Sequence, residues 1–213
     1  MEGRNHPVND IRIVGRDIAK TFNRRRIFSG ISFEISSPTS MAITGKNGAG
    51  KSTLAKIIAG VLSSTAGELR YESGGKKLDE ETRKDHIGFV SPYLNLYDEF
   101  SAMENLFLLL RIRSAGAPKE ARLETLLKRF SLWQRRDDSV RGYSTGMKQR
   151  LKYVFALAHS PSVLVLDEPT TNLDDDGIKV VEEVVKEQKQ SSILVVATND
   201  SAEAGWCGQR ISL

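Results

Sequence analysis

The sequence is poor in cysteine and contains no long hydrophobic run. Its single cysteine, Cys207, excludes an internal disulfide, and no apolar stretch of signal-peptide type precedes the first strand-like segment. The longest apolar cluster, LFLLL at residues 106–110, is closed by Arg111, so no window approaches the ~18 apolar residues of a membrane helix. We expect a cytoplasmic protein in which any membrane role depends on association with another protein.

The sequence also has no long segment in which charges of one sign are concentrated. The 213 residues carry a net charge of +4, but basic and acidic residues alternate, as at 119–124. This pattern favours a solvated face, so no nucleic-acid partner is expected. The one tight basic run, residues 24–26, is interpreted as a hairpin tip rather than a phosphate-binding patch. The three histidines (His6, His86 and His159) and one cysteine lack metal-ligand spacing, which predicts no zinc site and surface or satisfied histidines.

What the sequence does contain is a glycine-rich loop, GKNGAGKS, after a short apolar run and before a helical pattern. Such a loop directs backbone N–H groups at a polyphosphate, and the following helix N-terminus adds partial positive charge. We expect Lys51 to reach the outer phosphates and Ser52 to place its hydroxyl on Mg²⁺. The predicted ligand is a nucleoside triphosphate, with Mg²⁺. The predicted binding residues are Gly45, Lys46, Asn47, Gly48, Ala49, Gly50, Lys51, Ser52 and Thr53.

The order of periodic segments predicts an α/β fold. Residues 11–35 alternate as β-structure around a turn near 23–26, and GELRYES adds a second β-like pair. Helices are expected from Ser101, with a capping box to Glu104, through Arg113, and at about 119–130, 144–158 and 177–190. We predict a P-loop NTPase core with a mainly parallel sheet covered on both faces, an N-terminal antiparallel β subdomain and an inserted helical subdomain. Residues 1–213 form one domain, with core and β subdomain at about 10–97 and 160–213 and helices at about 98–159.

Two carboxylates follow a buried strand pattern, VLVL at residues 163–166. Ligands of open α/β sheets sit at this carboxyl end of the strands. Asp167 is suited to hold Mg²⁺, directly or through water, and Glu168 can polarise the water that attacks the γ-phosphorus. The competing interpretation is that both merely end a buried strand.

The segment YSTGMKQR, residues 143–150, stands at the head of a predicted helix, between the phosphate loop and the two carboxylates. With these motifs the chain resembles the ATP-binding cassette (ABC) ATPases over nearly all its length. YSTGMKQR resembles the family signature, VLVLDEP the Walker B segment, and TTNLD at residues 170–174 the D-loop. The resemblance implies a head-to-tail dimer enclosing two ATP molecules, in which Ser144 and Gly146 act at the site of the opposite subunit. Asp174 in the D-loop is predicted as a further ATP-binding residue. Phe22 resembles the aromatic residue that stacks on adenine, with core packing as the competing interpretation.

The chain departs from the family pattern at two positions. Where the family usually has a glutamine that touches Mg²⁺ and relays to the membrane partner, this chain has Pro92; Asn95 could substitute. Where the family has the switch histidine, Asn199 stands, and an amide can donate to a γ-phosphate but carries no positive charge. Glu168 argues against complete inactivity. We therefore expect slow hydrolysis, with Glu168, Lys51 and Asn199 as the catalytic residues.

The resemblance implies the ATPase subunit of an ABC transporter, closest to single-cassette bacterial exporter subunits. It would sit peripherally on the inner face of the membrane through an integral permease, whose coupling helix would meet a groove near Tyr93, Leu94, Leu96 and Tyr97. Ordinary loop packing is the alternative for these four residues. The alternative function is a non-transport ABC ATPase that acts as a nucleotide-dependent switch or assembly factor. P-loop kinases and small GTPases are disfavoured because they leave YSTGMKQR and TTNLD unexplained.

Overall fold

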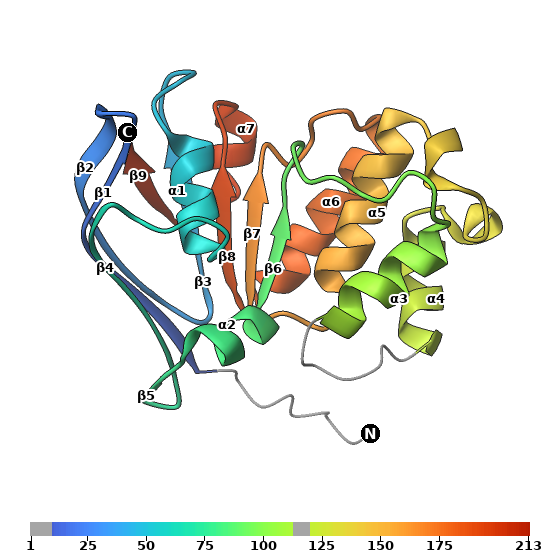
Figure 1. The fold of residues 1–213 in the computed structure, drawn as a ribbon, viewed down its shortest axis with the longest axis horizontal. Helices are drawn as coiled ribbons and strands as arrows, with labels where there is room; N and C mark the ends of the chain where they lie inside the picture. The colour runs from blue at the N-terminus through green and yellow to red at the C-terminus, as the bar shows by residue number, and fades with distance from the viewer. Residues whose placement is uncertain (1–9, 113–119) are drawn as a thin grey trace.

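A central parallel sheet organises the molecule. The computed structural model describes residues 10–112 and 120–213. Strands lie in the order β6-β7-β8-β3-β9, and every neighbouring pair is parallel (Figure 1). Their bounds are β6 Ile87–Val90, β7 Val163–Asp167, β8 Ile193–Ala197, β3 Thr39–Thr44 and β9 Gln209–Ser212. The buried strands are almost wholly apolar, as expected for a parallel sheet covered on both faces.

A second, antiparallel sheet has the order β2-β1-β4-β5 and is built from the N-terminal part of the chain. Its strands are β1 Ile11–Phe22, β2 Arg25–Ser36, β4 Ala66–Ser73 and the short β5 Lys76–Lys77. Asn23 and Arg24, both with positive φ, form the two-residue turn of the β1–β2 hairpin. The prediction that residues 24–26 lie at a hairpin tip is confirmed.

The helices largely follow the predicted segments. They are α1 Lys51–Ile58, α2 Glu80–His86, α3 Ala102–Ile112, α4 Glu120–Arg129, α5 Thr145–Leu157, α6 Asp175–Gln188 and α7 Ser201–Ala204, with 3₁₀ turns at Trp133–Arg135 and Val140–Gly142. Ser101 and Glu104 form the predicted capping box, with reciprocal bonds of 3.1 and 2.7 Å. The predicted helix end at Arg113, the break that follows and the start near Lys119 lie outside the described residues. Within the described residues no helix has the length and hydropathy to cross a membrane.

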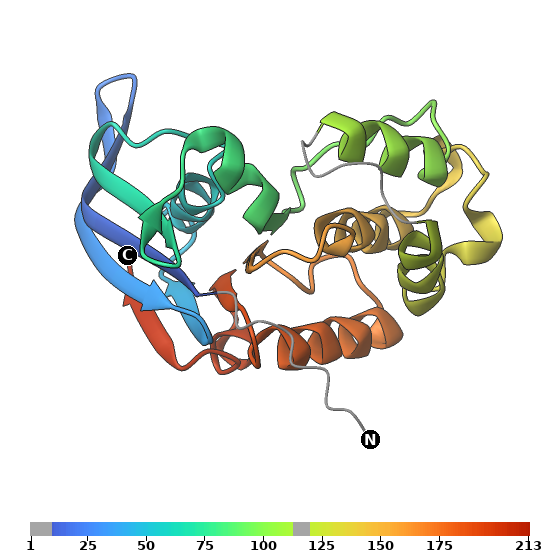
Figure 2. The same cartoon turned by 90° about the horizontal axis from the view of Figure 1, so that it is seen from below.

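The parallel sheet carries one hydrophobic core on each face. Along β7, Val163 and Val165 join α1 and the antiparallel sheet in one core, while Leu164 and Leu166 join α3, α4, α5 and α6 in the other. Figure 2 shows the antiparallel sheet with α1 and the helical half at opposite ends of the molecule. The alternation of side chains along a strand thus divides one strand between two layers. The predicted α/β architecture, with both faces covered, is confirmed.

Helix α5 packs closely against β6. A Cβ atom on Gly88 would lie 2.5 Å from the carbonyl oxygen of Ala156, so the approach requires glycine. The helix that begins at the YSTGMKQR segment is therefore seated directly on the core sheet. The subdomain boundaries near residues 98 and 159 stay a prediction.

Candidate nucleotide-binding site

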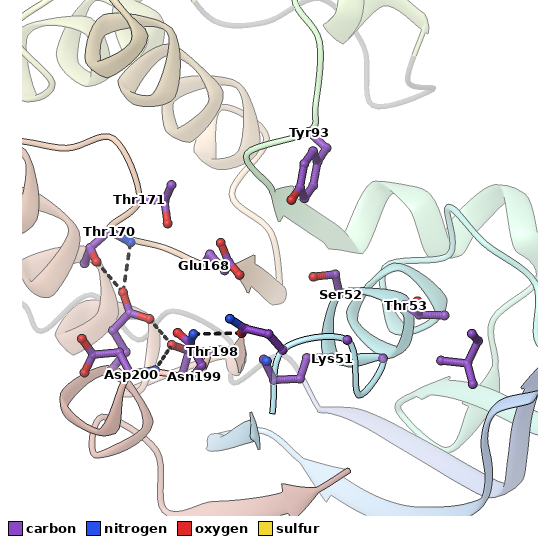
Figure 3. Close-up of a pocket in the computed structure, with 15 residues that line it drawn as sticks. Lys51, Ser52, Thr53, Tyr93, Glu168, Thr170, Thr171, Thr198, Asn199 and Asp200 are labelled. Carbon is purple, nitrogen blue, oxygen red and sulfur yellow. Dashed lines mark hydrogen bonds between the residues drawn. The ribbon is translucent and has the colours of Figure 1, made fainter. Parts of the chain in front are cut away.

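A cavity of about 620 Å³ opens where the phosphate loop meets the carboxyl ends of the parallel strands (Figure 3). Its lining comes from segments far apart in the sequence. The lining residues are Ile27, Asn47, Gly48, Gly50, Lys51, Ser52, Thr53, Tyr93, Glu168, Thr170, Thr171, Thr198, Asn199, Asp200 and Glu203. This is the edge at which open α/β sheets bind ligands.

The phosphate loop needs its glycines for conformation and for space. Gly45, Gly48 and Gly50 all have positive φ, at 148°, 83° and 104°. A Cβ on Gly50 would lie 2.6 Å from Cγ2 of Ile27, and one on Gly45 would lie 2.7 Å from the backbone oxygen of Leu213. Side chains are thus excluded at positions 45 and 50 of the loop that leads into the N-terminus of α1. This arrangement suits an anion held by backbone N–H groups.

Lys51 is placed to serve the same cavity. Its side chain is buried, and its ammonium donates to the carbonyl oxygens of Gly45 at 2.9 Å and Lys46 at 3.2 Å. These two bonds hold the charge beside the loop, where it can meet a phosphate with little rearrangement. The third N–H of an ammonium group remains available for a phosphate oxygen.

Two hydroxyl groups converge on Asp167, whose side chain is 1% exposed. Ser52 donates to its Oδ1 at 2.8 Å, and Ser91 donates to its Oδ2 at 3.0 Å. Oxygen donors of this kind fit Mg²⁺, which draws further ligands from phosphates and water. No group of three or more His, Cys, Asp or Glu in the described ranges is arranged to hold a metal, so the fit rests on Asp167 and the hydroxyls.

Ser91 was not predicted from the sequence as a site residue. It follows β6, and Val90 at the end of β6 is paired with Leu166 of β7. The parallel register therefore sets residue 91 beside residue 167. A prediction of strand order would have been needed to find this contact.

Glu168 leaves the strand in a strained conformation. Its φ is 48°, in the left-handed region, and its N–H donates to the carbonyl of Ala197 at 2.9 Å. A non-glycine residue in this region costs about 1–3 kcal/mol, so the surrounding structure must hold it there. The turn separates the two carboxylates: Asp167 is buried, while Glu168 is half-buried and lines the cavity (Figure 3).

Asn199 lies across the cavity from the phosphate loop and is linked to it. Its side-chain amide donates to Oδ1 of Asn47 at 3.0 Å (Figure 3). Asn199 follows Thr198, whose N–H donates to the carbonyl of Ile43 at 3.0 Å. The structure thus brings Lys51, Glu168 and Asn199, the three predicted catalytic residues, to one cavity.

A buried carboxylate, Glu203, organises the same side of the cavity. It accepts hydrogen bonds from the N–H of Thr170 at 3.2 Å and from the hydroxyls of Thr170 and Thr198. The segment after Glu168 is thereby tied to the segment that carries Asn199. The sequence did not predict this role, because α7 is too short to give a helical pattern.

The signature segment is built around a capped helix start. Ser144 is the N-cap of α5 and accepts from the N–H of Met147 at 3.2 Å. A Cβ on Gly146 would lie 3.0 Å from the carbonyl oxygen of Asn172, so this glycine lets the 170–174 segment approach the helix. Neither Ser144 nor Gly146 lines the cavity beside the phosphate loop.

Asp174 is likewise a cap. It accepts from the N–H of Gly177 at 3.0 Å at the start of α6, and it is ion-paired with Arg150 of α5. The hydrogen bond from Arg150, followed by that from Gly177, lowers the pKa of the Asp174 carboxyl below its usual range. Asp174 does not line the cavity of its own chain.

Phe22 does not belong to the core. It is 43% exposed at the end of β1, and the Lys20 ammonium lies 4.7 Å from the centre of its ring. The packing interpretation is therefore wrong. Ile27 from the neighbouring strand β2 lines the cavity, whereas Phe22 does not, and adenine stacking by Phe22 stays a prediction.

The loop after β6 divides between two surroundings. Tyr93, 70% exposed, lines the nucleotide-side cavity, while Asn95 lines a separate cavity of about 320 Å³ together with Pro92. Asn95 is thus not positioned in the first cavity as a substitute for the missing glutamine. Leu94 and Leu96 are half-buried against the two cores and also line the separate cavity, so the choice between loop packing and a permease contact stays a prediction for this pair.

The two histidines that the structure describes, His86 and His159, have neighbours within hydrogen-bond distance. His86 Nδ1 lies 3.3 Å from the Ser162 hydroxyl, and His159 Nε2 lies 3.2 Å from the carbonyl oxygen of Ile87. His6 lies outside the described residues. Neither described histidine lines the nucleotide-side cavity.

Comparisons with known proteins agree with this geometry. The family model described as "ABC transporter" matches residues 28–171. The lipoprotein-releasing system ATP-binding protein LolD 1 of Caulobacter vibrioides is 31% identical over 214 residues, covering 94% of this chain and 92% of that protein. The linearmycin resistance ATP-binding protein LnrL of Bacillus subtilis is 32% identical over 191 residues, covering 88% of this chain but 60% of that protein.

Solved structures give the same result. A dimeric, post-hydrolysis ATP-binding cassette bound to ADP and Pi superposes with a TM-score of 0.83 at 27% identity, with 94% of each chain covered. An ATP-binding subunit of an ABC transporter superposes with a TM-score of 0.82 at 27% identity, covering 94% of this chain and 85% of that one. The geometry of the site and these matches lead to one conclusion. The chain belongs to the ABC transporter family, among its ATP-binding subunits.

Proposed function

We propose that this chain hydrolyses ATP in the presence of Mg²⁺, as one half of a head-to-tail dimer, and that it powers a separate integral membrane permease. The observation that carries the proposal is that the site residues of one chain do not all face the same cavity. The phosphate loop and Glu168 face a common cavity, whereas the capped start of α5 lies outside it. A second copy would bring its signature helix to that cavity.

In the proposed reaction the phosphate loop binds and orients ATP. Lys51 and the N–H groups at the start of α1 contact the phosphates, and Ser52 and Asp167 hold Mg²⁺ through oxygen. When bound, Mg²⁺ supplies positive charge that offsets charge on the phosphates. Glu168 accepts a proton from the attacking water, and its half-buried carboxylate in the cavity suits this role.

The dimer follows from the electrostatics of α5. A helix N-terminus carries partial positive charge, and Gly146 leaves one position of the first turn without a side chain. The γ-phosphate of an ATP molecule on the opposite copy is a fitting ligand for Ser144 and Gly146. Dimeric cassettes among the similar solved structures support this arrangement.

We further propose that hydrolysis is slow. Pro92 offers no side-chain ligand where the family has glutamine, and Asn199 is held by Asn47 where the family has a histidine. The amide of Asn199 can donate a hydrogen bond to phosphate but cannot supply a positive charge. We therefore propose that hydrolysis is slow because the charge of the transition state is weakly stabilised, and not because ATP binds weakly.

The permease partner is supported by the relatives, which are named as ATP-binding proteins of export and lipoprotein-releasing systems. On this chain Tyr93 and Tyr97 are 70% and 51% exposed in the loop after β6. We propose these two aromatic residues for the permease contact. This places the subunit on the cytoplasmic side of the membrane, held there by its partner.

The deciding experiment is phosphate release from Mg²⁺-ATP over a range of protein concentrations, with Glu168→Gln beside the parent chain. We expect a rate that rises faster than linearly with concentration and falls ~10²- to 10⁴-fold in the variant. Equal rates in the two chains would contradict the assignment of Glu168. If both lack release and ATP still drives dimer formation, the chain acts as a nucleotide-dependent switch, or hydrolysis requires the permease, and adding a permease separates these two outcomes.

A further inference from the structure

A buried ammonium lies between the signature helix and the loop after β6. Lys152, on α5, is 7% exposed, and burial lowers the pKa of its side chain, with the nearby charge of Lys148 adding to the effect. Among the residues that the structure describes, no carboxylate forms an ion pair with it. A buried charge without a counter-ion is costly and needs strong hydrogen bonds. Its presence calls for a specific role.

The ammonium binds two backbone carbonyls of the loop. Lys152 Nζ donates to the carbonyl oxygen of Pro92 at 2.7 Å and to that of Ser91 at 3.2 Å. An ammonium group only donates, and the carbonyl oxygens of these two residues are its acceptors. The bonds fix the main chain where β6 ends and the loop begins.

The side chain of Ser91 continues the connection. It donates to Oδ2 of Asp167, whose Oδ1 accepts from Ser52 at the start of α1. An unbroken series of hydrogen bonds thus runs from α5, through the backbone and hydroxyl of Ser91, to the carboxylate beside the phosphate loop.

The signature segment lies at the N-terminus of α5. Lys152 lies about 12 Å along the helix from Ser144, at about 1.5 Å per residue. The next residue, Tyr153, donates from its hydroxyl to the carbonyl of Pro169 at 2.8 Å, one residue after Glu168. Helix α5 is therefore fastened on both sides of the strand end that carries Asp167 and Glu168.

We propose that Lys152 is a positioning residue that couples the carboxylate end of a chain's own ATP site to the signature helix that the same chain presents to a second copy. The side chain of Pro92 cannot form hydrogen bonds. The connection instead runs from Lys152 to the backbone carbonyl of Ser91 and from the Ser91 hydroxyl to Asp167. The inference rests on the proposed dimer. Lys152 does not line the nucleotide-side cavity, so it would act through Ser91 and Asp167.

The test measures ATP-dependent dimerisation and ATP binding separately, in the full chain carrying Glu168→Gln so that ATP is not consumed. Sedimentation velocity with Mg²⁺-ATP gives the dimer dissociation constant, and equilibrium dialysis at low protein concentration gives the ATP affinity of the monomer. The variants are Lys152→Met, Ser91→Ala and both together. The control is Lys128→Met on α4, which removes a lysine side chain outside the signature segment, where it pairs with Glu124 at 2.6 Å.

We expect Lys152→Met to weaken the dimer at least tenfold while the monomer's ATP affinity changes less than threefold. Ser91→Ala should weaken the dimer at least threefold, and the double variant should be no weaker than Lys152→Met within twofold, because both changes interrupt one connection. Lys128→Met should stay within threefold of the parent. If thermal melting shows that the Met variant does not fold, Lys152→Gln replaces it, with at least a threefold weaker dimer expected.

Three results would overturn the coupling: a Lys152→Met chain that dimerises like its parent, equal losses in dimerisation and monomer affinity, or additive effects in the double variant. Failure of the proposed function looks different. In that case the parent Glu168→Gln chain itself forms no dimer with ATP.

Discussion

The phosphate loop and the signature segment both stand at helix N-termini, but only the phosphate loop faces the cavity of its own chain. At α1 the loop glycines have positive φ, Lys51 lies alongside, and the residues face a cavity within their own chain. At α5 the N-cap serine and Gly146 are equally well defined, yet they line no part of that cavity. The start of α1 thus lines a cavity within its own chain, whereas Ser144 and Gly146 at the start of α5 do not line that cavity.

This difference is the basis of the proposal that one ATP site is shared between two chains. The first helix start supplies binding residues and, through Ser52, a link to Asp167. The second supplies a positive helix end next to the D-loop residues 170–174, with Arg150 bound to Asp174. Changes in the two regions should therefore separate ATP binding from dimer formation.

The largest expected separation comes from Lys51→Ala. Loss of a charged donor to phosphate should weaken ATP binding to the monomer by roughly 10²-fold, since such bonds contribute about 1.5–3 kcal/mol each. Lys76→Ala, at an exposed position on β5 away from the cavity, is the control and should change the affinity by less than threefold. Dialysis with labelled ATP measures both, and similar losses at the two lysines would contradict a specific role for Lys51.

The converse change is Ser144→Asp. Aspartate caps a helix about as well as serine, so α5 should keep its start while negative charge opposes a phosphate. We expect ATP affinity of the monomer within twofold of the parent and a dimer at least tenfold weaker in sedimentation experiments. Ser144→Asn, a neutral cap, should dimerise better than the Asp variant, and equal behaviour of the two would remove the electrostatic argument.

A smaller effect is expected at Asn199. Asn199→His restores a side chain that can carry a positive charge near the γ-phosphate, so phosphate release should rise about tenfold, most clearly below pH 6.5 where the imidazole is protonated. ATP affinity should change little. A turnover equal to that of the parent chain across this pH range would mean that residue 199 does not limit hydrolysis.

The smallest effect concerns Asp174. Because Arg150 and the Gly177 N–H lower its pKa in the folded chain, its ionised form stabilises the fold above the unfolded-state pKa of about 3.9. That contribution is lost as the pH falls through the lowered folded-state pKa. Asp174→Asn, which retains a capping side chain, should lower the melting temperature slightly at pH 7, with the difference shrinking as the pH falls below 3.9. A pH-independent difference in melting temperature would exclude the charge as its cause.

The sequence predicted the parts of the fold and site that depend on local pattern. The phosphate loop, the strand before Asp167 and the Ser144 cap are each encoded within a few consecutive residues. The short elements β5, β9, α2 and α7 were missed, because segments of so few residues give no usable periodicity.

The contacts that could not be predicted depend on strand order. Ser91 reaches Asp167 because β6 lies beside β7, and Lys152 reaches Pro92 because Gly88 allows α5 close to β6. Nothing near either residue in the sequence signals its partner. The exposure of Phe22 was undecided for the same reason, since one aromatic residue at a strand end fits both a core and a surface.

The most direct test of the central claim, that each ATP site is shared between two chains, is complementation. Lys51→Ala and Ser144→Asp chains are purified separately, and phosphate release is measured for each alone and for their mixture. The account predicts a rate in the mixture well above the sum of the separate rates, because the mixed dimer contains one intact site made of the second chain's phosphate loop and the first chain's Ser144. A mixture that only equals that sum would contradict the shared site.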